Sequence, residues 1–357
     1  MGEKFDITSL TLKELEKFLL SSGEPKYRAR QIFSWIHDRT VSSFVQMTDL
    51  PKTFRDHMES EYRLEVPDIL SIHDSDITGS RKFLLELSDG SKVESVFLPE
   101  GNRRTVCLSS QVGCPLGCKF CATGKMGILR DLSTAEIVAQ LYAIKREVKE
   151  RITNVVFMGM GEPLLNYDAV LKAAELIHHE AGGNIGLRKI TISTSGIAPR
   201  IRQFADEHHP YQLAFSLNAT TDQVRTEIMP INRKHDLATC LDALEYYSSR
   251  SRQRVTVEYV LLPGVNNSRE DAERLIKIVR RLRAKLNVIP FNPIPETPFQ
   301  QPTQEEMEKF LSRLSPAIQI VTVRWSQGSD IRAACGQLFV QNVKKKSHLA
   351  DKTQYLA

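Results

Sequence analysis

Short apolar runs alternate with longer amphipathic stretches from about residue 105 onward. The apolar runs predict buried strands, at 154–158, 189–193, 212–217, 255–261 and 287–291. The amphipathic stretches predict helices, near 134–149, 167–179, 197–207, 237–249, 268–282 and 304–314. Strands that alternate with helices of this length indicate a parallel sheet. We therefore expect an α/β fold of the TIM-barrel type, full or partial, with its chemistry at the C-terminal ends of the strands.

The N-terminal part of the chain has a different pattern. Three stretches with helical periodicity precede residue 66, and the first follows a capping box formed by Thr11 and Glu14. Two apolar runs, 83–87 and 93–98, then flank an Asp-Gly turn, which predicts a β-hairpin. The end of the chain is polar and contains three consecutive lysines, which is typical of a disordered tail. The predicted units are a helical domain, a hairpin extension, an α/β domain and this tail, at 1–65, 66–104, 105–341 and 342–357.

Composition narrows the class of protein. The 357 residues are 41% hydrophobic, which allows a large core, and no apolar run is long enough to predict a membrane span. The N-terminus lacks the apolar segment of an export signal, so we expect a cytoplasmic protein. The formal net charge of +5 is compatible with a nucleic-acid partner but does not require one.

Three of the six cysteines, Cys114, Cys118 and Cys121, form a Cys-x3-Cys-x2-Cys motif. Without an export signal, such a cluster favours metal binding over disulfides. Three thiolates can ligate three irons of a [4Fe–4S] cluster and leave the fourth iron open to the amine and carboxylate of S-adenosylmethionine (SAM). A structural zinc site would need a fourth ligand, and no histidine or second Cys-x2-Cys pair follows closely. The motif therefore predicts a radical SAM enzyme.

Five further segments carry a resemblance to one family. They begin at Arg104, Gly159, Ser193, Met229 and Ala333, and they read RTVCLSSQVGC, GMGEP, STSG, MPIN and AACGQ. With these motifs the chain resembles the RlmN/Cfr family of radical SAM RNA methyltransferases over nearly its whole length. The resemblance implies a partial (βα)6 barrel with an N-terminal helical accessory domain that helps to grip RNA. It also implies a [4Fe–4S] cluster and two SAM molecules per turnover.

The reaction of this family gives a role to cysteines outside the motif. In the family, one SAM methylates a C-terminal cysteine, and a second SAM supplies a radical that activates this methyl group for addition to adenine. Another cysteine then releases the product and leaves a disulfide bond. By resemblance, Cys335 is the methyl carrier, Cys107 is the resolving cysteine and Glu94 is the general base. From the residues alone, Cys335 would be a small buried residue, Cys107 an additional ligand and Glu94 an exposed strand residue.

Polar residues that follow the predicted strands are the expected SAM contacts. Glycines after the first of these strands let the backbone approach a ligand closely, and the glutamate beside them could accept a hydrogen bond from the SAM amine. The set implied by the resemblance is Gly161, Glu162, Ser193, Ser216, Leu217, Asn218 and Asn292. Many relatives have histidine where this chain has Asn218, so that contact departs from the family pattern.

The resemblance allows two reactions. An RlmN-like enzyme methylates C2 of an adenine in the peptidyl-transferase region of 23S rRNA, and C2 of the adenine next to the tRNA anticodon. A Cfr-like enzyme methylates C8 of the same rRNA adenine and confers antibiotic resistance. The pair Ser326-Gln327 is typical of the Cfr type, whereas the segments that start at Cys107 and Cys114 are closer to the RlmN type, and we favour C2.

A non-catalytic iron–sulfur protein that binds RNA is the alternative from another class. It would explain the cysteine motif, but it leaves Cys335 and Glu162 without a role. The expected partners of the enzyme are ribosomal RNA, tRNA and an electron donor such as flavodoxin or ferredoxin. No membrane is expected.

Overall fold

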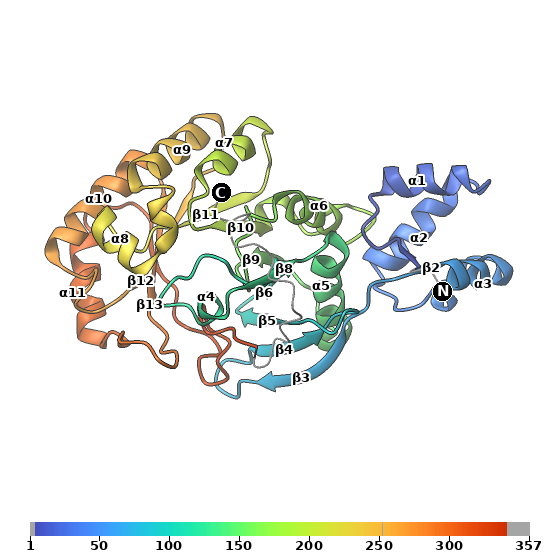
Figure 1. The fold of residues 1–357 in the computed structure, drawn as a ribbon, viewed down its shortest axis with the longest axis horizontal. Helices are drawn as coiled ribbons and strands as arrows, with labels where there is room; N and C mark the ends of the chain where they lie inside the picture. Colours follow the sequence, from blue (N-terminus) through green and yellow to red (C-terminus); the bar gives the residue numbers. More distant parts are fainter. Residues whose placement is uncertain (1–3, 252, 341–357) are drawn as a thin grey trace.

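One ten-stranded sheet runs through the computed structural model, which describes residues 4–251 and 253–340. Its strand order is β14-β13-β12-β11-β10-β9-β6-β5-β4-β3. Every neighbouring pair from β6 to β14 is parallel, and every pair from β6 to β3 is antiparallel. The sheet is therefore a parallel part joined at β6 to an antiparallel extension (Figure 1).

The parallel part confirms the predicted α/β class. Its strands are β6 (Arg103–Cys107), β9 (Asn154–Phe157), β10 (Ile190–Thr194), β11 (Gln212–Ser216), β12 (Thr256–Leu261), β13 (Lys285–Pro290) and β14 (Val321–Val323). The main helices between them lie on the outer side of the sheet (Figure 1), and they are α5 (Thr134–Val148), α6 (Tyr167–His178), α7 (Ala198–Asp206), α9 (Leu237–Arg250), α10 (Arg269–Leu282) and α11 (Gln304–Leu314). Helix α5 begins with the expected capping box, in which the Ser133 hydroxyl accepts from the Glu136 amide at 3.1 Å.

Three helices form the N-terminal region, as predicted. They are α1 (Leu12–Ser21), α2 (Tyr27–His37) and α3 (Lys52–Glu61), with a short 3-10 turn, η1 (Phe44–Gln46), before α3. Strands β1 (Phe5–Asp6) and β2 (Tyr62–Arg63) pair and bring the two ends of this region together. It contacts the sheet-bearing part through His37, whose Nδ1 lies 2.5 Å from the Tyr142 hydroxyl on α5. The boundary at residue 65 stays a prediction, and the predicted tail at 342–357 lies outside the described residues.

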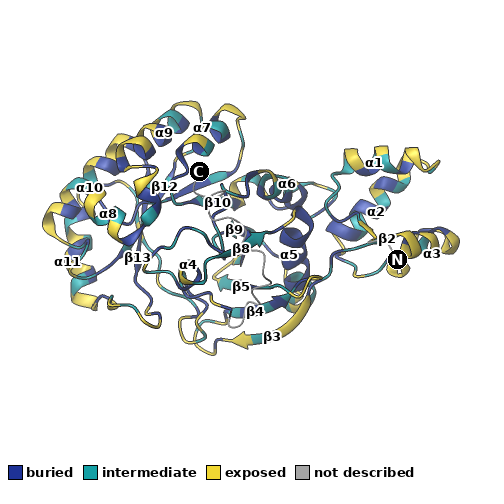
Figure 2. Ribbon diagram, in the orientation of Figure 1, coloured by how far each residue is buried: buried dark blue, intermediate teal, exposed yellow. Residues whose placement is uncertain are grey.

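Several elements have no clear signal in the sequence. The predicted hairpin is present as β4 (Arg81–Glu86) and β5 (Lys92–Glu100), but β3 (Asp68–Asp74) pairs with β4 as a third strand. Strand β3 is mostly exposed at the sheet edge (Figure 2), so it has no apolar run. Strand β6, which joins the two parts of the sheet, was also not predicted, and neither were β1, β2 and η1. The remaining unpredicted elements are short, and they are β7 (Gln111–Gly113), α4 (Ala122–Met126), β8 (Ile128–Asp131), η2 (Leu187–Lys189), α8 (Asp222–Ile228), η3 (Pro230–Arg233) and β14. Four of them, β7, α4, α8 and η3, lie near the predicted cluster site.

No helix in the described part of the chain is long and apolar enough to cross a membrane. The parallel strands are largely buried, whereas the outer faces of α1, α3, α10 and α11 are exposed (Figure 2). This burial places the hydrophobic core between the sheet and its outer helices. The loops at the C-terminal ends of the strands are therefore left to form a site.

Candidate active site

The three motif cysteines lie on a tightly constrained loop between β7 and α4, with Cys121 as the N-cap of α4. Gly113 has φ +83°, and a Cβ there would lie 2.0 Å from the Gly127 carbonyl oxygen. The Cys114 amide donates to that same oxygen at 2.8 Å. A Cβ on Gly124 would lie 2.9 Å from the Cys118 amide nitrogen. Glycine is thus required where the two sides of the loop meet, and the three thiols are held in one region.

The donor chemistry of this loop fits an iron–sulfur cluster. Burial raises the pKa of Cys118 to about 12 and that of Cys114 well above its usual range, and the neighbouring thiols add to both shifts. Within the described ranges, no three His, Cys, Asp or Glu side chains are arranged to hold a single metal ion. The thiolates of a cubane bind different irons and so lie farther apart than the ligands of one ion. Three thiols of this kind suit a cluster better than the zinc alternative, which needs four convergent ligands.

A cavity of about 160 Å³ adjoins the three cysteines, and we call it the cluster cavity. It is lined by six of the predicted SAM contacts, Gly161, Glu162, Ser193, Ser216, Asn218 and Asn292. Leu217 is the exception, because its backbone is engaged elsewhere. Its amide donates to the Glu258 carbonyl at 3.0 Å, and its carbonyl accepts from Arg225 Nε at 3.2 Å. The structure therefore does not bring Leu217 into this cavity.

Glu162 lies buried just beyond the C-terminal end of β9. Its Oε2 accepts from the Ser195 amide at 2.8 Å, and its Oε1 accepts from the Leu164 amide at 3.2 Å. Burial raises the pKa of this carboxyl group. Glu162 lines the cluster cavity, and a carboxylate can accept several hydrogen bonds, so it can also accept from an amine there. Gly161, at φ +102°, holds this turn, since a Cβ there would lie 2.7 Å from Cβ of Gln111.

Two polar atoms in the lining of the cluster cavity make no hydrogen bond with the described residues. Glu258, on β12, lines this cavity but was not predicted as a site residue. The sequence does contain a signal for it, because a charged residue interrupts an otherwise apolar strand. Its Oε1 accepts from Asn287 Nδ2 at 2.9 Å, but its Oε2 and the Oδ1 of Asn292 find no hydrogen-bond partner among the described residues. Buried acceptors without partners are costly. A ligand with several donors, such as SAM with its amine and ribose hydroxyls, fits this lining.

Arg225, on α8, is a second residue that sequence reasoning missed. It is fully buried, and its guanidinium donates to Ser195 O at 2.5 Å and to Asn232 Oδ1 at 2.8 Å, in addition to Leu217 O. These bonds tie together the C-terminal ends of β10 and β11. The sequence gives no sign of this role, because an arginine in a short polar helix is normally exposed.

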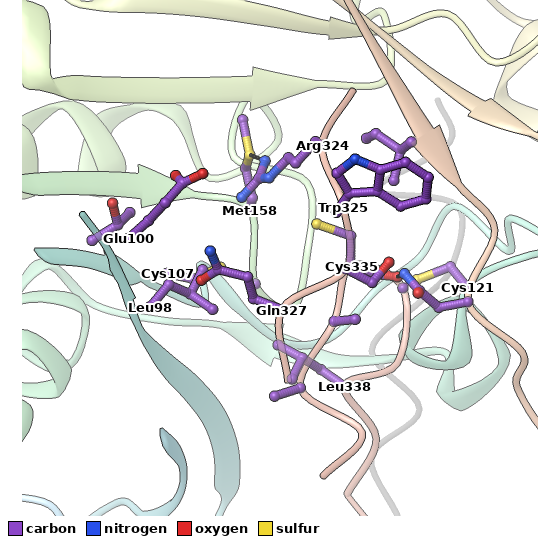
Figure 3. A pocket seen from close by; sticks show the side chains of 18 of the residues that line it. Leu98, Glu100, Cys107, Cys121, Met158, Arg324, Trp325, Gln327, Cys335 and Leu338 are labelled. Atoms are coloured by element: carbon purple, nitrogen blue, oxygen red, sulfur yellow. Dashed lines mark hydrogen bonds between the residues drawn. The ribbon is translucent and has the colours of Figure 1, made fainter. Parts of the chain in front are cut away.

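A second cavity, of about 230 Å³, contains Cys107 and Cys335 together, and we call it the thiol cavity. Cys107 is the last residue of β6, and burial raises its pKa to about 12. Arg324 lies beside Met158 and Cys335 (Figure 3), with Nη1 at 3.3 Å from the Met158 sulfur. The proximity of Cys335, Glu258 and Cys107 raises the pKa of Arg324, so its charge is retained and can stabilise a thiolate. Both cavities include Cys121, Arg324 and Cys335 in their linings.

The segment around Cys335 is fixed through its backbone carbonyls against the start of α4, which follows the cysteine loop, and against the residues after β13. The Cys335 carbonyl accepts from Asn292 Nδ2 at 3.1 Å, and the Gly336 carbonyl accepts from the Ala122 amide at 2.7 Å. Further along, the Leu338 carbonyl accepts from the Thr123 hydroxyl at 2.7 Å. These contacts join residues far apart in sequence, and they hold the predicted methyl carrier where the two cavities meet.

Glu94, the predicted base, is not among the residues that line either cavity. It lies on β5, where its Oε1 is 2.9 Å from Lys82 Nζ and its Oε2 accepts from the Phe339 amide at 2.8 Å. Burial raises the pKa of Glu94, and it is not the exposed residue that its strand position alone predicts. Glu100, at the end of the same strand, does line the thiol cavity.

All six cysteines are free thiols, so the structure contains no disulfide between Cys107 and Cys335. The sixth cysteine, Cys240, is buried in α9 with its sulfur 3.3 Å from the Gly196 carbonyl oxygen. Cys240 is therefore a core residue.

Comparison with known proteins gives consistent matches. Residues 108–279 match the Radical SAM superfamily, and residues 5–64 match the ribosomal RNA large subunit methyltransferase N-terminal domain. A dual-specificity RNA methyltransferase RlmN from Geobacter sulfurreducens is 45% identical over 340 residues, which covers 95% of this chain and 93% of the relative. The protein of the same name from Geotalea uraniireducens is 44% identical over 336 residues, covering 94% and 97%. The crystal structure of a radical SAM methyltransferase from Sphaerobacter thermophilus matches with a TM-score of 0.89 and 42% identity, over 94% of this chain and 99% of that one.

Proposed function

Because the chain belongs to the RlmN family of dual-specificity radical SAM RNA methyltransferases, we propose that it methylates C2 of adenine in RNA. The substrates are the adenine in the peptidyl-transferase region of 23S rRNA and the adenine next to the tRNA anticodon. One observation carries the proposal: Cys335 lines both the cluster cavity and the thiol cavity, and Cys107 lines the latter. A methyl-carrying cysteine needs this position, because it must receive the methyl group on one side and deliver it on the other.

The residues of the cluster cavity divide into two sets. Cys114, Cys118 and Cys121 would hold the [4Fe–4S] cluster, while Glu162 and Asn292 would orient SAM through its polar groups. When bound, the cluster and SAM supply the methyl group and the radical that activates it. The protein contributes a buried cavity whose walls keep water away from the reacting groups.

Cys335 would carry the methyl group as a thioether, and its sulfur must be a thiolate to accept that group, because the thiolate is the nucleophile. The Arg324 guanidinium, close to both thiols, stabilises negative charge there. To release the product, the Cys107 thiolate attacks the Cys335 sulfur and the bond from that sulfur to the product carbon breaks. The bonding electron pair stays on carbon, which takes a proton to complete the methyl group, and a Cys107–Cys335 disulfide forms. An external reductant then restores both thiols.

Glu94 remains the proposed general base. Its carboxylate would have to give up its contacts with Lys82 and the Phe339 amide before it could reach an adenine in the thiol cavity. Glu100 lines that cavity without such a rearrangement and is the competing candidate. Comparison of Glu94→Gln with Glu100→Gln separates the two candidates. The substitution that removes the general base should slow methylation, whereas the other substitution should not.

The remaining assignments follow from the family. Residues 1–65 would help to bind RNA, and flavodoxin or ferredoxin would supply electrons. The enzyme would act in the cytoplasm, where its RNA substrates are made.

The test is to incubate anaerobically reconstituted enzyme with SAM, a reductant and unmodified rRNA or tRNA. The RNA is then digested, and methyladenosine isomers are identified by mass spectrometry against standards. 2-Methyladenosine is expected, and it should be absent with Cys335→Ala and Cys107→Ala. Formation of 8-methyladenosine would show that the enzyme catalyses the Cfr-like reaction instead. SAM cleavage without either isomer would show that the proposed RNA substrates are incorrect.

A further inference from the structure

The thiol cavity has an exposed aromatic side chain at its edge. Trp325 lines this cavity although 61% of its surface is accessible to solvent. Figure 3 shows its indole ring beside Cys335. A large apolar ring left in water is unfavourable, and such a ring at a cavity edge is typical of a surface that a ligand covers.

Two polar atoms next to Trp325 in sequence have no partner. Gln327 Oε1 and Ser326 Oγ are buried, and neither makes a hydrogen bond with any residue that the structure describes. Both residues line the thiol cavity. Such atoms are rare in proteins, because an unmade hydrogen bond costs free energy. They indicate a ligand that brings hydrogen-bonding groups into the cavity.

The loop that carries these side chains is held in place. Gly328 has φ +69°, and its carbonyl accepts from the Ala333 amide at 2.7 Å. Asp330 accepts from the Ser75 hydroxyl at 2.9 Å, which fastens the loop to the turn after β3. The Arg332 carbonyl accepts from Lys82 Nζ at 3.3 Å. The loop therefore presents its side chains from a fixed position and requires little ordering when a ligand binds.

The size and chemistry of the cavity suit a purine base. An apolar cavity of about 150 Å³ can bind benzene, and the thiol cavity measures about 230 Å³ and is open to the exposed indole. Aromatic side chains bind unstacked bases by stacking. A glutamine carboxamide can pair with adenine through two hydrogen bonds, one to the N6 amino group and one to N7.

We infer that Trp325 and Gln327 form the subsite that binds the target adenine after it leaves the RNA stack, an inference that rests on the function proposed above. The indole stacks on the face of the base, and the Gln327 carboxamide pairs with its N6 and N7 edge. C8 adjoins N7, whereas C2 lies across the ring from this edge. The pairing therefore occupies the C8 side and leaves C2 free to face Cys335. Guanine has an acceptor, O6, where adenine has its amino group, so the same contact selects adenine.

Fluorescence tests the stacking contact without any catalytic turnover. The chain has two tryptophans, so Trp35→Phe leaves Trp325 as the single emitter. Reconstituted Trp35→Phe enzyme is titrated with RNA hairpins that carry adenine, guanine or an abasic nucleotide at the target position. Adenine RNA should quench the Trp325 emission, and abasic RNA of equal affinity should not. Equal quenching by both RNAs would overturn the stacking contact.

Kinetics on the otherwise native chain provide a second test, in case Trp35→Phe does not fold. Trp325→Ala should lower kcat/KM for RNA roughly ten- to hundredfold, mainly through KM, and Trp325→Phe should keep most of the activity. Gln327→Ala should reduce the preference for adenine over guanine RNA in competition binding by roughly ten- to hundredfold. Ile77→Ala, at a side chain 81% exposed and outside the cavity, is the control.

The outcomes separate this inference from the proposed function. If the wild type forms 2-methyladenosine and both alanine variants keep its kcat/KM and base preference, the subsite is wrong and the function stands. If the wild type forms no 2-methyladenosine, but adenine RNA quenches the Trp325 emission and guanine and abasic RNA do not, the proposed function is wrong and the base subsite stands.

Discussion

The two cavities adjoin each other but are built in different ways. The three thiols of the cluster cavity come from one short loop, and its remaining lining comes largely from the ends of consecutive parallel strands. The thiol cavity brings β5 and β6 together with the segment 323–338. More than half of the chain separates this segment from the two strands. The thiols of the cluster cavity are thus positioned by their spacing in the sequence, whereas the thiol cavity depends on contacts between distant parts of the chain.

This difference separates cofactor chemistry from substrate chemistry. The cluster cavity needs thiols at fixed spacing and glycines where backbones approach closely, which a contiguous motif provides. The thiol cavity carries Trp325, Gln327 and Arg324 on a loop that other parts of the protein hold in place. Changes on that loop can therefore alter how RNA binds while the cysteine motif remains intact. Substitutions in each cavity can show how far the two cavities are independent.

The largest effect is expected from Cys118→Ala. Loss of one of three thiol ligands should remove the cluster, and with it SAM cleavage and methylation. Iron and acid-labile sulfide, measured after anaerobic reconstitution, should fall to background. Cys240→Ala is the matched control, because Cys240 is buried in α9 away from both cavities and its variant should keep its iron. Full iron content in Cys118→Ala would contradict the ligand assignment.

Cys335→Ala should separate the two cavities. Methylation of RNA should fall by at least about a thousandfold, because the methyl carrier is absent. Iron content should stay at the wild-type level, since the contacts that fasten this segment beside the cysteine loop are made by the backbone carbonyls of Gly336 and Leu338. With SAM labelled in its methyl group, acid-precipitated wild-type protein should retain label and the variant should not. Label on the variant protein would place the carrier at another residue.

The same contrast explains what could be predicted from sequence. The parallel strands, the helices and the cysteine motif have local signals in periodicity and spacing, and the structure confirms the α/β class. The meeting of Cys107 with Cys335 could be predicted only through a family resemblance, because no local pattern links positions so far apart. The contacts of Glu94 with Lys82 and Phe339 had no signal at all, since they depend on strand pairing and on the return of the chain.

Arg225→Met should weaken the fold beneath the cluster cavity. The substitution leaves the buried Leu217 carbonyl, the partly buried Ser195 carbonyl and Asn232 Oδ1 without this donor. We expect the free energy of unfolding to fall by about 3 kcal/mol, as when a buried charged hydrogen-bonding group is removed. Urea denaturation measures the change. Arg30→Met is the control, because Arg30 is exposed and its ion pair with Glu180 is long, at 3.8 Å, so a change within about 0.5 kcal/mol is expected. A similar loss in both variants would show that Arg225 has no special role.

The smallest effect concerns the pH dependence of stability at Glu94, which lies outside both cavities yet contacts the segment that carries Cys335. Burial raises the folded-state pKa of this carboxyl group above its ordinary value of 4.5, with Lys82 opposing the shift. A group with a raised pKa binds its proton more tightly in the folded protein. Its contribution to stability is therefore present below about pH 4.5 and is lost as the pH rises through the folded-state pKa.

Glu94→Gln removes this titration. The free energy of unfolding of the wild type, measured relative to Glu94→Gln in urea at several pH values, should therefore decrease as the pH rises above 4.5. Glu308→Gln, at an exposed position on α11, should show no such trend relative to the wild type. A difference that instead grows with pH would mean that Lys82 and the Phe339 amide outweigh burial. Glu94 would then be held as a carboxylate in the folded protein, which would strengthen its assignment as the base and connect the hairpin extension directly to the chemistry of the thiol cavity.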